Sequence, residues 1–393
     1  MGNELTVRVG VDATTWVNRR GYGRFARNAV RALVERDRAT RYVIYIDSLT
    51  AEEADLPSGA ETRLVKLRSA PSEAASANSS RSIRDILRMS LAVRHDRPDV
   101  FLFPSIYTYF PVIGTPTVVG IHDAIPSEFP TLTLPGLRAR LFFRAKEHLA
   151  LAGARRLFTV SEASRRAIVT GLGISAERLT VVPEAPDPVF RPVSPEAVSA
   201  AKASVGLMQE ERYLLYAGGI SPHKNIETLI AALARLTPPR PRLVIVGDLE
   251  RETFVSAAAA VRSQIAALGL GSDVKLPGFV SDETLAALYA GAGAVVLPSL
   301  AEGFGLPAVE AAACGAPLLL SDIPAHRETL GDAAVFFPPL AVERLASELQ
   351  RLLADEAARA EVARRCGEAV AGLSWNATAD ILARLLRDAA GRS

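Results

Sequence analysis

Short apolar segments alternate with longer helical segments along the whole chain, and this alternation constrains the fold more than any other feature. Residues 213–217 (YLLYA) and 294–297 (AVVL) are two of the short segments. The longer segments between them are rich in Ala, Leu and Arg and have helical periodicity. This is the βαβ rhythm of parallel sheets whose two faces are covered by helices. The sequence therefore predicts the α/β class, with doubly wound, Rossmann-like parallel sheets.

The apolar segments fall into two groups, one in each half of the chain. In the first half we expect strands at 6–11, 42–46, 100–103, 117–121, 157–160 and 179–182. In the second half we expect them at 213–217, 242–246, 274–276, 294–297, 317–320 and 334–337. Each group is predicted to form its own sheet.

A proline-rich segment at 183–195 separates the two groups. Five prolines in thirteen residues forbid a helix and favour an extended connector. We therefore expect an N-terminal domain at 1–187 and a C-terminal domain at 188–374, with a last helix at about 375–393 that could pack back on the first domain. Open α/β sheets bind ligands at the carboxyl ends of their strands, so we expect the two domains to face each other across a ligand-binding cleft.

Charge and cysteine content narrow the classes of function. The 45 Lys and Arg residues nearly balance the 43 Asp and Glu residues, and a net charge of +2 over 393 residues does not favour a nucleic-acid partner. Two cysteines cannot form a disulfide framework. The N-terminal residues show no signal-peptide pattern and no segment predicts a membrane span, so we expect a cytoplasmic protein.

Two glutamates stand eight residues apart in the segment 302–310 (EGFGLPAVE), just after the predicted strand 294–297. Pro307 fits the first turn of a helix, which places Glu302 in the loop and Glu310 about one turn into that helix. Gly303 and Gly305 allow the backbone to approach a ligand closely. Spacing alone leaves a second interpretation equally open, a Gly-rich turn with one solvated glutamate.

A second Gly-rich loop at 216–225 (YAGGISPHKN) also leads from a strand to a helix, with Asn225 as the expected N-cap. Lys224 is one of only five lysines in the chain. A lysine at the start of a helix neutralises a phosphate where the backbone dipole already favours an anion. A surface lysine is the simpler alternative, but the position of Lys224 between two glycines and a helix cap favours a function.

Together these loops resemble the retaining glycosyltransferases of family 4, which have the GT-B fold. The pair Glu302 and Glu310 looks like the E-x7-E motif of that family, and 218–224 looks like its donor-phosphate loop. The segment 276–281 (LPGFVS) is similar to the segment beside the nucleotide base. The G-x5-KN form of the loop is also similar to a subgroup that uses mannose-type donors, which is a weak guide to the donor here.

The resemblance implies roles for individual residues. Glu310 would bind the ribose hydroxyls, Glu302 the donor sugar and Lys224 the diphosphate. The other implied donor-binding residues are Gly218, Gly219, Phe279, Val280, Gly303, Phe304, Gly305 and Leu306. Many members carry an arginine at the place of Gly219, so the phosphate clamp has one cation fewer here or borrows an arginine from elsewhere.

The first half of the chain supplies two further candidates. Gly21 and Gly23 precede a predicted helix through Leu33 and resemble the N-terminal loop that closes on the donor in this family, although a turn with positive φ would explain them almost as well. His122 and Asp123 follow the strand 117–121 and look like the family's His-Asp. We therefore expect the catalytic residues to be His122, Asp123, Lys224 and Glu302.

Two charge features bear on cofactors and partners. No two aspartates stand two apart, so the D-x-D element of metal-dependent glycosyltransferases is missing, and we expect no metal and no other cofactor. The segment 137–146 with Arg155, Arg156, Arg165 and Arg166 is basic with interleaved apolar residues. A solvated helix face explains it most simply, and weak contact with the inner membrane surface or a lipid-phosphate acceptor is the alternative.

The sequence thus predicts a retaining, metal-independent transfer of a hexosyl group from a nucleoside-diphosphate sugar of GDP-mannose or UDP-hexose type. The acceptor is a hydroxyl of a saccharide, a lipid-linked molecule or a natural product. Two alternatives are a nucleotide-sugar epimerase or oxidoreductase of similar architecture and a catalytically silent nucleotide-sugar binder. An oxidoreductase would be expected to carry GxGxxG, which the sequence lacks.

Overall fold

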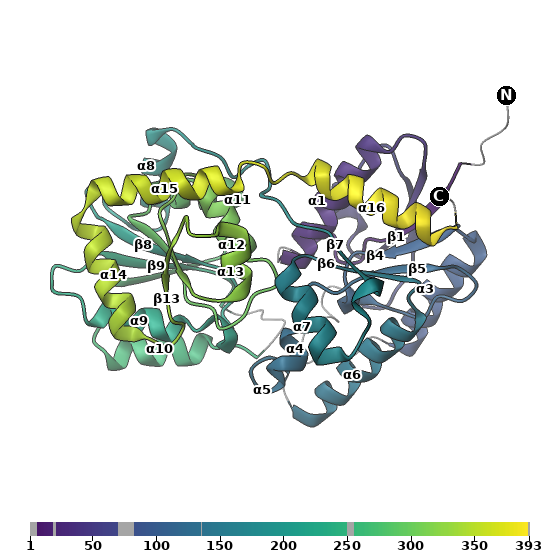
Figure 1. The fold of residues 1–393 in the computed structure, drawn as a ribbon, viewed down its shortest axis with the longest axis horizontal. Helices are drawn as coiled ribbons and strands as arrows, with labels where there is room; N and C mark the ends of the chain where they lie inside the picture. Colours follow the sequence, from purple (N-terminus) through teal and green to yellow (C-terminus); the bar gives the residue numbers. More distant parts are fainter. Residues whose placement is uncertain (1–5, 19–20, 70–81, 135, 250–254, 392–393) are drawn as a thin grey trace. The chain divides into compact units, whose positions relative to one another are not determined.

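The computed structural model describes residues 6–18, 21–69, 82–134, 136–249 and 255–391. The chain divides into two compact units (Figure 1). The N-terminal unit is drawn from residues 1–184 and 374–393, and the C-terminal unit from residues 185–373. The division falls in the proline-rich segment, three residues before the expected boundary.

Each unit is built on one parallel sheet, which confirms the predicted α/β class. In the N-terminal unit the strand order is β3-β2-β1-β4-β5-β6-β7. The strands are β1 (Arg8–Asp12), β2 (Arg41–Asp47), β3 (Glu61–Val65), β4 (Val100–Phe103), β5 (Thr117–Gly120), β6 (Arg156–Thr159) and β7 (Leu179–Val181). The helices are α1 (Gly21–Arg36), α3 (Ile83–Asp96), α4 (Ile125–Glu128), α5 (Pro130–Thr133), α6 (Gly136–Gly153), α7 (Glu162–Leu172) and α16 (Trp375–Ala389).

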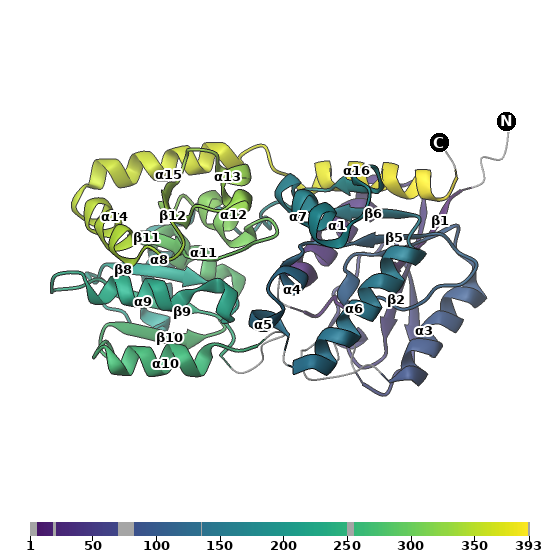
Figure 2. The ribbon, with the colours of Figure 1, turned by 60° about the horizontal axis from the view of Figure 1, so that its bottom comes forward.

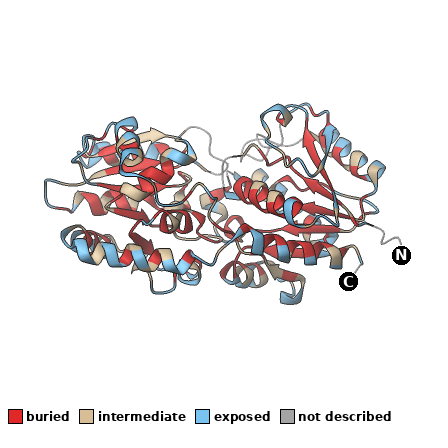
Figure 3. Ribbon diagram, turned by 90° about the horizontal axis from the view of Figure 1, so that it is seen from above, coloured by how far each residue is buried: buried red, intermediate tan, exposed pale blue. Residues whose placement is uncertain are grey.

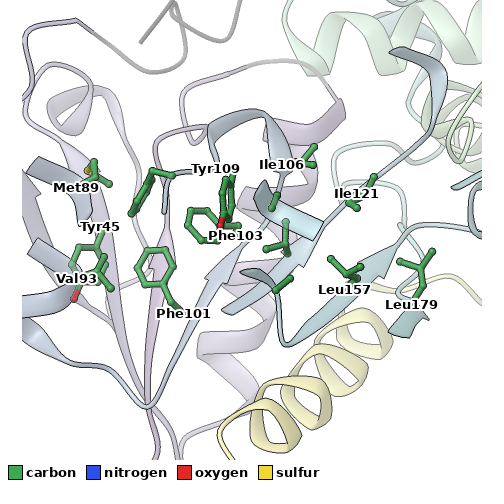
Figure 4. Close-up of a cluster of buried hydrophobic side chains, with 14 of the residues drawn as sticks. Tyr45, Met89, Val93, Phe101, Phe103, Ile106, Tyr109, Ile121, Leu157 and Leu179 are labelled. Carbon is green, nitrogen blue, oxygen red and sulfur yellow. The ribbon is translucent and has the colours of Figure 1, made fainter. Parts of the chain in front are cut away.

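The helices of the N-terminal unit cover both faces of its sheet (Figure 2). Side chains of α3, α6 and α7 belong to one buried cluster that contains Met89, Phe101, Phe103 and Leu157 and is drawn in Figure 4. On the other face, Phe158 stacks against Phe25 of α1, since neighbouring residues of a strand point to opposite faces. The sequence pattern of buried strands and amphipathic helices thus produces a three-layer unit.

The C-terminal unit has the strand order β10-β9-β8-β11-β12-β13. The strands are β8 (Tyr213–Ala217), β9 (Arg242–Val246), β10 (Val274–Gly278), β11 (Ala294–Leu297), β12 (Leu318–Ser321) and β13 (Val335–Phe337). The helices are α8 (Pro195–Ser204), α9 (Ile226–Ala234), α10 (Ala258–Ala267), α11 (Asp282–Gly291), α12 (Leu306–Ala313), α13 (Pro324–Leu330), α14 (Val342–Ala354) and α15 (Glu356–Val370). The inner strands β8, β11 and β12 are buried at every residue, whereas the edge strands β10 and β13 are only partly buried (Figure 3 colours the ribbon by burial).

Serine caps fix where several helices begin. Ser161, Ser281 and Ser374 accept a hydrogen bond from the backbone N–H three residues on, at the starts of α7, α11 and α16. The last helix, α16, packs against α1, and Thr378 donates a 2.6 Å hydrogen bond to the carbonyl of Pro183. The end of the chain is therefore part of the N-terminal unit.

Two details differ from the sequence-based expectations. The strand β3 was not predicted, because four residues of its sequence ETRLV are exposed at the sheet edge and leave no apolar run. Asn225 occupies the N-cap position of α9, but its side chain does not cap the helix. Its backbone is left-handed, with φ of 53°, and its side chain bonds to other loops.

Candidate active site

The loops after the neighbouring strands β8 and β11 are joined by hydrogen bonds at the carboxyl edge of the C-terminal sheet. The backbone N–H of Leu300 donates to the carbonyl of His223 at 2.8 Å. The side-chain amide of Asn225 donates to the carbonyls of Pro298 at 2.9 Å and Pro339 at 2.7 Å. These bonds hold the two Gly-rich loops of the sequence in one fixed arrangement.

An ion pair between Lys224 and Glu302 is the centre of this arrangement. The Lys224 ammonium donates to both carboxylate oxygens of Glu302 at 2.8 Å, and Ser299 donates to Oε1 of the same carboxylate at 2.6 Å. The Lys224 side chain is 17% exposed and that of Glu302 is 11% exposed. The structure thus brings together the two residues that the sequence predicted for the diphosphate and the sugar.

The ion pair keeps the Glu302 carboxyl ionised despite its burial. Burial alone would raise the pKa of Glu302, but the charge of Lys224 and the hydrogen bonds from Lys224 and Ser299 lower that pKa to about 2. His326 also acts on this carboxyl, but burial lowers the pKa of His326, so its ring is neutral at pH 7 and Lys224 carries the effect. The result is a carboxylate that stays ionised at neutral pH in a partly dry environment.

The N-terminus of α12 follows Glu302 directly. Gly305 stands at its N-cap with φ of 86°, a left-handed conformation that glycine adopts without strain. Among the described residues, none accepts a hydrogen bond from the backbone N–H groups of Phe304, Gly305 or Leu306. Pro307 lies in the first turn, as the sequence predicted. Unpaired N–H groups at a helix N-terminus attract an anion.

Glu310 lies in the second turn of α12 and is buried, with 3% of its surface exposed. Glu310 and Cys314 stand four residues apart and so share one side of the helix. Burial raises the pKa of the Cys314 thiol to about 12, and the Glu310 carboxylate adds to that effect. Both glutamates of the E-x7-E pattern therefore belong to one loop-and-helix segment, with Glu302 before the helix and Glu310 within it.

His326 lies beside this segment and was not among the predicted site residues. Its Nδ1 lies 3.0 Å from the carbonyl of Ser321, so Nδ1 carries the proton. Its Nε2 is buried and has no hydrogen-bond partner among the described residues. A Cβ built on Gly305 would lie 3.0 Å from the ring. The sequence signal for His326 is weaker than that for His122, because His326 stands six residues after the predicted strand 317–320 and His122 follows its strand directly.

Glycines end the three strands β8, β9 and β10 at the same edge. The N–H of Gly218 donates to Val246, and that of Gly247 donates to Gly278. A Cβ on Gly247 would lie 2.3 Å from the carbonyl of Gly218, so no larger residue fits. Gly247 was not predicted as a site residue. The predicted donor-binding residues Gly219, Phe279 and Val280 also follow these strands, and Phe279 is 47% exposed.

The candidate residues of the N-terminal unit lie at the carboxyl edge of its own sheet. His122 follows β5, is buried, and donates from Nε2 to the carbonyl of Pro104 at 2.8 Å, while Nδ1 lies 3.7 Å from the carboxylate of Glu184. Burial lowers the pKa of His122 to about 4, although the bond to Pro104 raises it. At neutral pH the ring is therefore uncharged, with its lone pair on Nδ1.

The other N-terminal candidates have structural contacts of their own. Asp123 accepts a hydrogen bond from the N–H of Ile125 at the start of α4. Gly21 and Gly23 lie in the first turn of α1 with helical backbone, so the interpretation of these glycines as a turn with positive φ is wrong. A Cβ on Gly23 would lie 2.1 Å from the carbonyl of Asn18, which explains the glycine there.

Two further findings concern metals and membranes. In the described part of the chain, no group of three or more His, Cys, Asp or Glu side chains is arranged to hold a metal ion. Among the described helices, none is both long enough and apolar enough to cross a membrane.

Comparisons with known proteins follow the same division into two units. The family model "Glycosyl transferases group 1" matches residues 199–371, and "Glycosyl transferase 4-like domain" matches residues 20–185. The chain is 32% identical over 232 residues to the O-antigen chain mannosyltransferase B of Escherichia coli, an alignment that covers 58% of this chain and 59% of that relative. This chain thus spans about six tenths of the length of that relative.

Solved structures share the fold at low sequence identity. A sucrose-phosphate synthase from Thermosynechococcus elongatus superposes with a TM-score of 0.77 at 20% identity, covering 97% of this chain and 98% of that chain. The Anabaena protein HepE, in complex with UDP and glucose, superposes with a TM-score of 0.72 at 19% identity, covering 97% and 99%. The N-terminal unit matches the glycosyl transferase 4-like model, and the C-terminal unit matches the glycosyl transferases group 1 model. This chain therefore belongs to the family 4 glycosyltransferases and has the GT-B fold.

Proposed function

We propose that this protein transfers a hexosyl group from a nucleoside-diphosphate sugar to an acceptor hydroxyl, with retention of the anomeric configuration and without a metal ion. The single observation that carries the proposal is the Lys224–Glu302 pair beside the N-terminus of α12. It brings one cation, one carboxylate and a set of unpaired amides together from two loops at the carboxyl edge of the C-terminal sheet.

The hydrogen-bonding capacity of the pair fits a sugar diphosphate. Lys224 has three N–H donors and uses two of them on Glu302, which leaves the third for a phosphate oxygen. Glu302 accepts three hydrogen bonds, and a carboxylate has about four lone-pair sites, so Oε2 can still accept a sugar hydroxyl. The N–H groups of 304–306 complete an anion site for the phosphates.

The transfer itself needs position and charge more than a covalent partner. The bond between the anomeric carbon and the diphosphate breaks, and the leaving oxygen is stabilised by Lys224 and the N-terminus of α12. The acceptor hydroxyl attacks from the face that the diphosphate leaves, and a phosphate oxygen takes its proton. His122 and Asp123 of the N-terminal unit are further proposed catalytic residues.

The donor is proposed to be of GDP-mannose or UDP-hexose type. The E. coli relative is named as a mannosyltransferase, and the HepE structure contains UDP and glucose. Glu310 is proposed to bind the ribose, and Phe279 and Val280 to lie beside the base. The acceptor is proposed to be a hydroxyl of a saccharide, a lipid-linked molecule or a natural product.

The reaction is tested by incubating the full chain with GDP-mannose or UDP-glucose, with and without acceptors, and measuring the released nucleoside diphosphate by chromatography and the products by mass spectrometry. Removing one charge-stabilising group typically costs 10²–10³-fold in rate. We expect losses of this order for Lys224→Ala, Glu302→Ala and Glu310→Ala. Near-normal turnover in all three variants would reject the site.

A matched control comes from the opposite edge of the same sheet. Glu211 pairs with Arg242 at 2.7 Å, near the amino ends of β8 and β9, and its side chain is largely buried like that of Glu302. Glu211→Gln should therefore keep the activity. Addition of EDTA should also leave the rate unchanged, and a rate that depends on added Mg²⁺ or Mn²⁺ would contradict the metal-independent proposal.

Gly219 stands where many family members carry an arginine, so the phosphate site lacks that second cation. This favours one alternative, a protein that binds a nucleotide sugar without catalysing transfer. Tight binding of the donor with no release of nucleotide, even in the presence of acceptors, would favour that alternative. The family matches give no support to the epimerase alternative.

We also propose that the protein acts in the cytoplasm, in peripheral contact with the inner face of the membrane. The basic and apolar segment at 137–146 supports this location, because arginines with interleaved apolar side chains suit an anionic lipid surface.

A further inference from the structure

The outer sides of α3 and α6 carry large apolar side chains that are exposed in the described part of the chain. On α3 they are Ile83, Leu87 and Leu91, spaced four residues apart, so that they form one stripe. On α6 they are Leu137, Leu141 and Phe142. All six are more than half exposed, which is unusual for side chains of this size on two neighbouring helices.

The exposed acid-base side chains of α3 and α6 are all basic. Arg84 and Arg94 on α3 and Arg138 and Arg144 on α6 are exposed. The acidic residues of the two helices, Asp85, Asp96 and Glu147, are buried or partly buried. No residue that is exposed in 82–97, 109–114 or 136–153 is acidic. In these described segments the exposed acid-base side chains are therefore all basic, although the net charge of the chain is only +2.

The two helices lie on the same face of the N-terminal sheet. Met89 and Val93 of α3 and Ala150 of α6 pack into one buried cluster, part of which Figure 4 shows. The segment between β4 and β5 links the helices, because Ser90 donates to the carbonyl of Pro111 at 2.7 Å and Tyr109 donates to the carbonyl of Leu149 at 3.3 Å. The two outer stripes therefore belong to one surface, which we name the basic-apolar surface.

Two cations of the basic pattern found in the sequence, Lys146 and Arg165, do not belong to the basic-apolar surface. Lys146 donates to the carbonyl of Tyr107 and lies over the ring of Phe143, so it points inward. Arg165 pairs with Glu162 on α7. The stripe on α3, in contrast, was not part of the sequence-based hypothesis, because α3 ends 40 residues before α6 begins.

We propose that the basic-apolar surface binds the headgroup region of an anionic lipid bilayer. Arginines attract the lipid phosphates, and leucine, isoleucine and phenylalanine side chains insert at the boundary with the acyl chains. The combination of exposed arginines with large exposed apolar side chains favours this partner, because lipid phosphates attract the arginines and the acyl boundary accepts the apolar side chains. The inference rests on the peripheral contact of the proposed function and gives it a location in the fold.

The test is flotation of the full chain with vesicles of phosphatidylcholine containing 30% phosphatidylglycerol, and with vesicles of phosphatidylcholine alone. We expect binding to the anionic vesicles only, with weaker binding at 500 mM NaCl, because salt screens the attraction. Each arginine near an anionic surface contributes about fivefold in affinity. The triple variant Arg84→Glu, Arg138→Glu, Arg144→Glu should therefore bind at least about a hundredfold more weakly.

The matched control reverses three exposed arginines elsewhere, in the variant Arg212→Glu, Arg262→Glu, Arg384→Glu. It changes the net charge by the same amount, so it should retain most of the binding if the location of the charges matters. Circular dichroism checks that both variants are folded. A third variant, Leu137→Ser, Leu141→Ser, Phe142→Ser, should also lose vesicle binding without a change of net charge.

Several outcomes would overturn the inference. These are no binding of the unmodified chain to anionic vesicles, equal binding to both kinds of vesicle, or equal losses in the two arginine variants. A serine variant that dissociates an oligomer in light scattering and keeps its vesicle binding would show that the surface joins copies of this chain. Vesicle binding needs no sugar donor, so failure of the transferase proposal would appear only in the nucleotide-release assay.

Discussion

Removal of the Lys224 ammonium should destabilise the C-terminal unit by an amount that the structure allows us to work out. The pKa of Glu302 is lowered from its ordinary value of 4.5 to about 2. Each tenfold change in proton affinity is worth about 1.4 kcal/mol, so the ionised carboxylate contributes about 3 kcal/mol to the free energy of unfolding at pH 7. Loss of one partner of a buried pair typically costs 3–5 kcal/mol.

We therefore expect Lys224→Met to lower the free energy of unfolding at pH 7 by about 3 kcal/mol. The double variant Lys224→Met, Glu302→Gln should recover much of this loss, because it removes the unpaired buried charge. The pH dependence has a defined sign. The folded-state pKa is lowered, so the stabilisation by Glu302 is complete above about pH 4.5 and disappears as the pH falls toward 2.

The assay is urea unfolding followed by two signals. Both tryptophans, Trp16 and Trp375, lie in the N-terminal unit, so their fluorescence reports on that unit, and far-ultraviolet circular dichroism reports on both units. The variant should shift the circular dichroism transition more than the fluorescence transition. A free energy of unfolding for Lys224→Met within about 0.5 kcal/mol of the unmodified chain, a difference typical of a surface substitution, would refute the argument.

Three further predictions concern single side chains. Gly305→Ala places a Cβ at φ of 86° and 3.0 Å from His326. We therefore expect the free energy of unfolding to fall by about 1–2 kcal/mol and the affinity for the donor, measured by calorimetry, to weaken. Unchanged values would contradict the proposed role of the α12 N-terminus. Asn225→Ala removes the hydrogen bonds to the carbonyls of Pro298 and Pro339. The free energy of unfolding measured in urea should therefore fall by about 2–3 kcal/mol. A smaller decrease would show that the two loops do not depend on this side chain. Burial lowers the pKa of His122 to about 4. The free energy of unfolding of the unmodified chain, followed by tryptophan fluorescence, should therefore fall by about 3 kcal/mol between about pH 6.5 and pH 4. The free energy of unfolding of His122→Gln should fall markedly less over that interval.

The sequence alone determined the class of fold and most of the strands. Runs such as 213–217 and 294–297 are apolar on every residue, and only a strand covered on both faces buries them completely. The edge strand β3 escaped prediction because its exposed residues carry no such pattern. The family resemblance followed from several short loop motifs taken together, because the spacing of the glycines and glutamates in 302–310 by itself left a purely structural turn equally open.

Only the tertiary structure decided how the side chains of the site meet. Lys224 and Glu302 lie 78 residues apart and become neighbours because β8 pairs with β11, which is not the next strand in the chain. The pairing of parallel strands that are distant in sequence depends on the whole sheet, so no local pattern specifies it. The same holds for His326, whose contact with Gly305 depends on β12 lying beside β11, and for the basic-apolar surface, which exists only because α3 and α6 pack on one core.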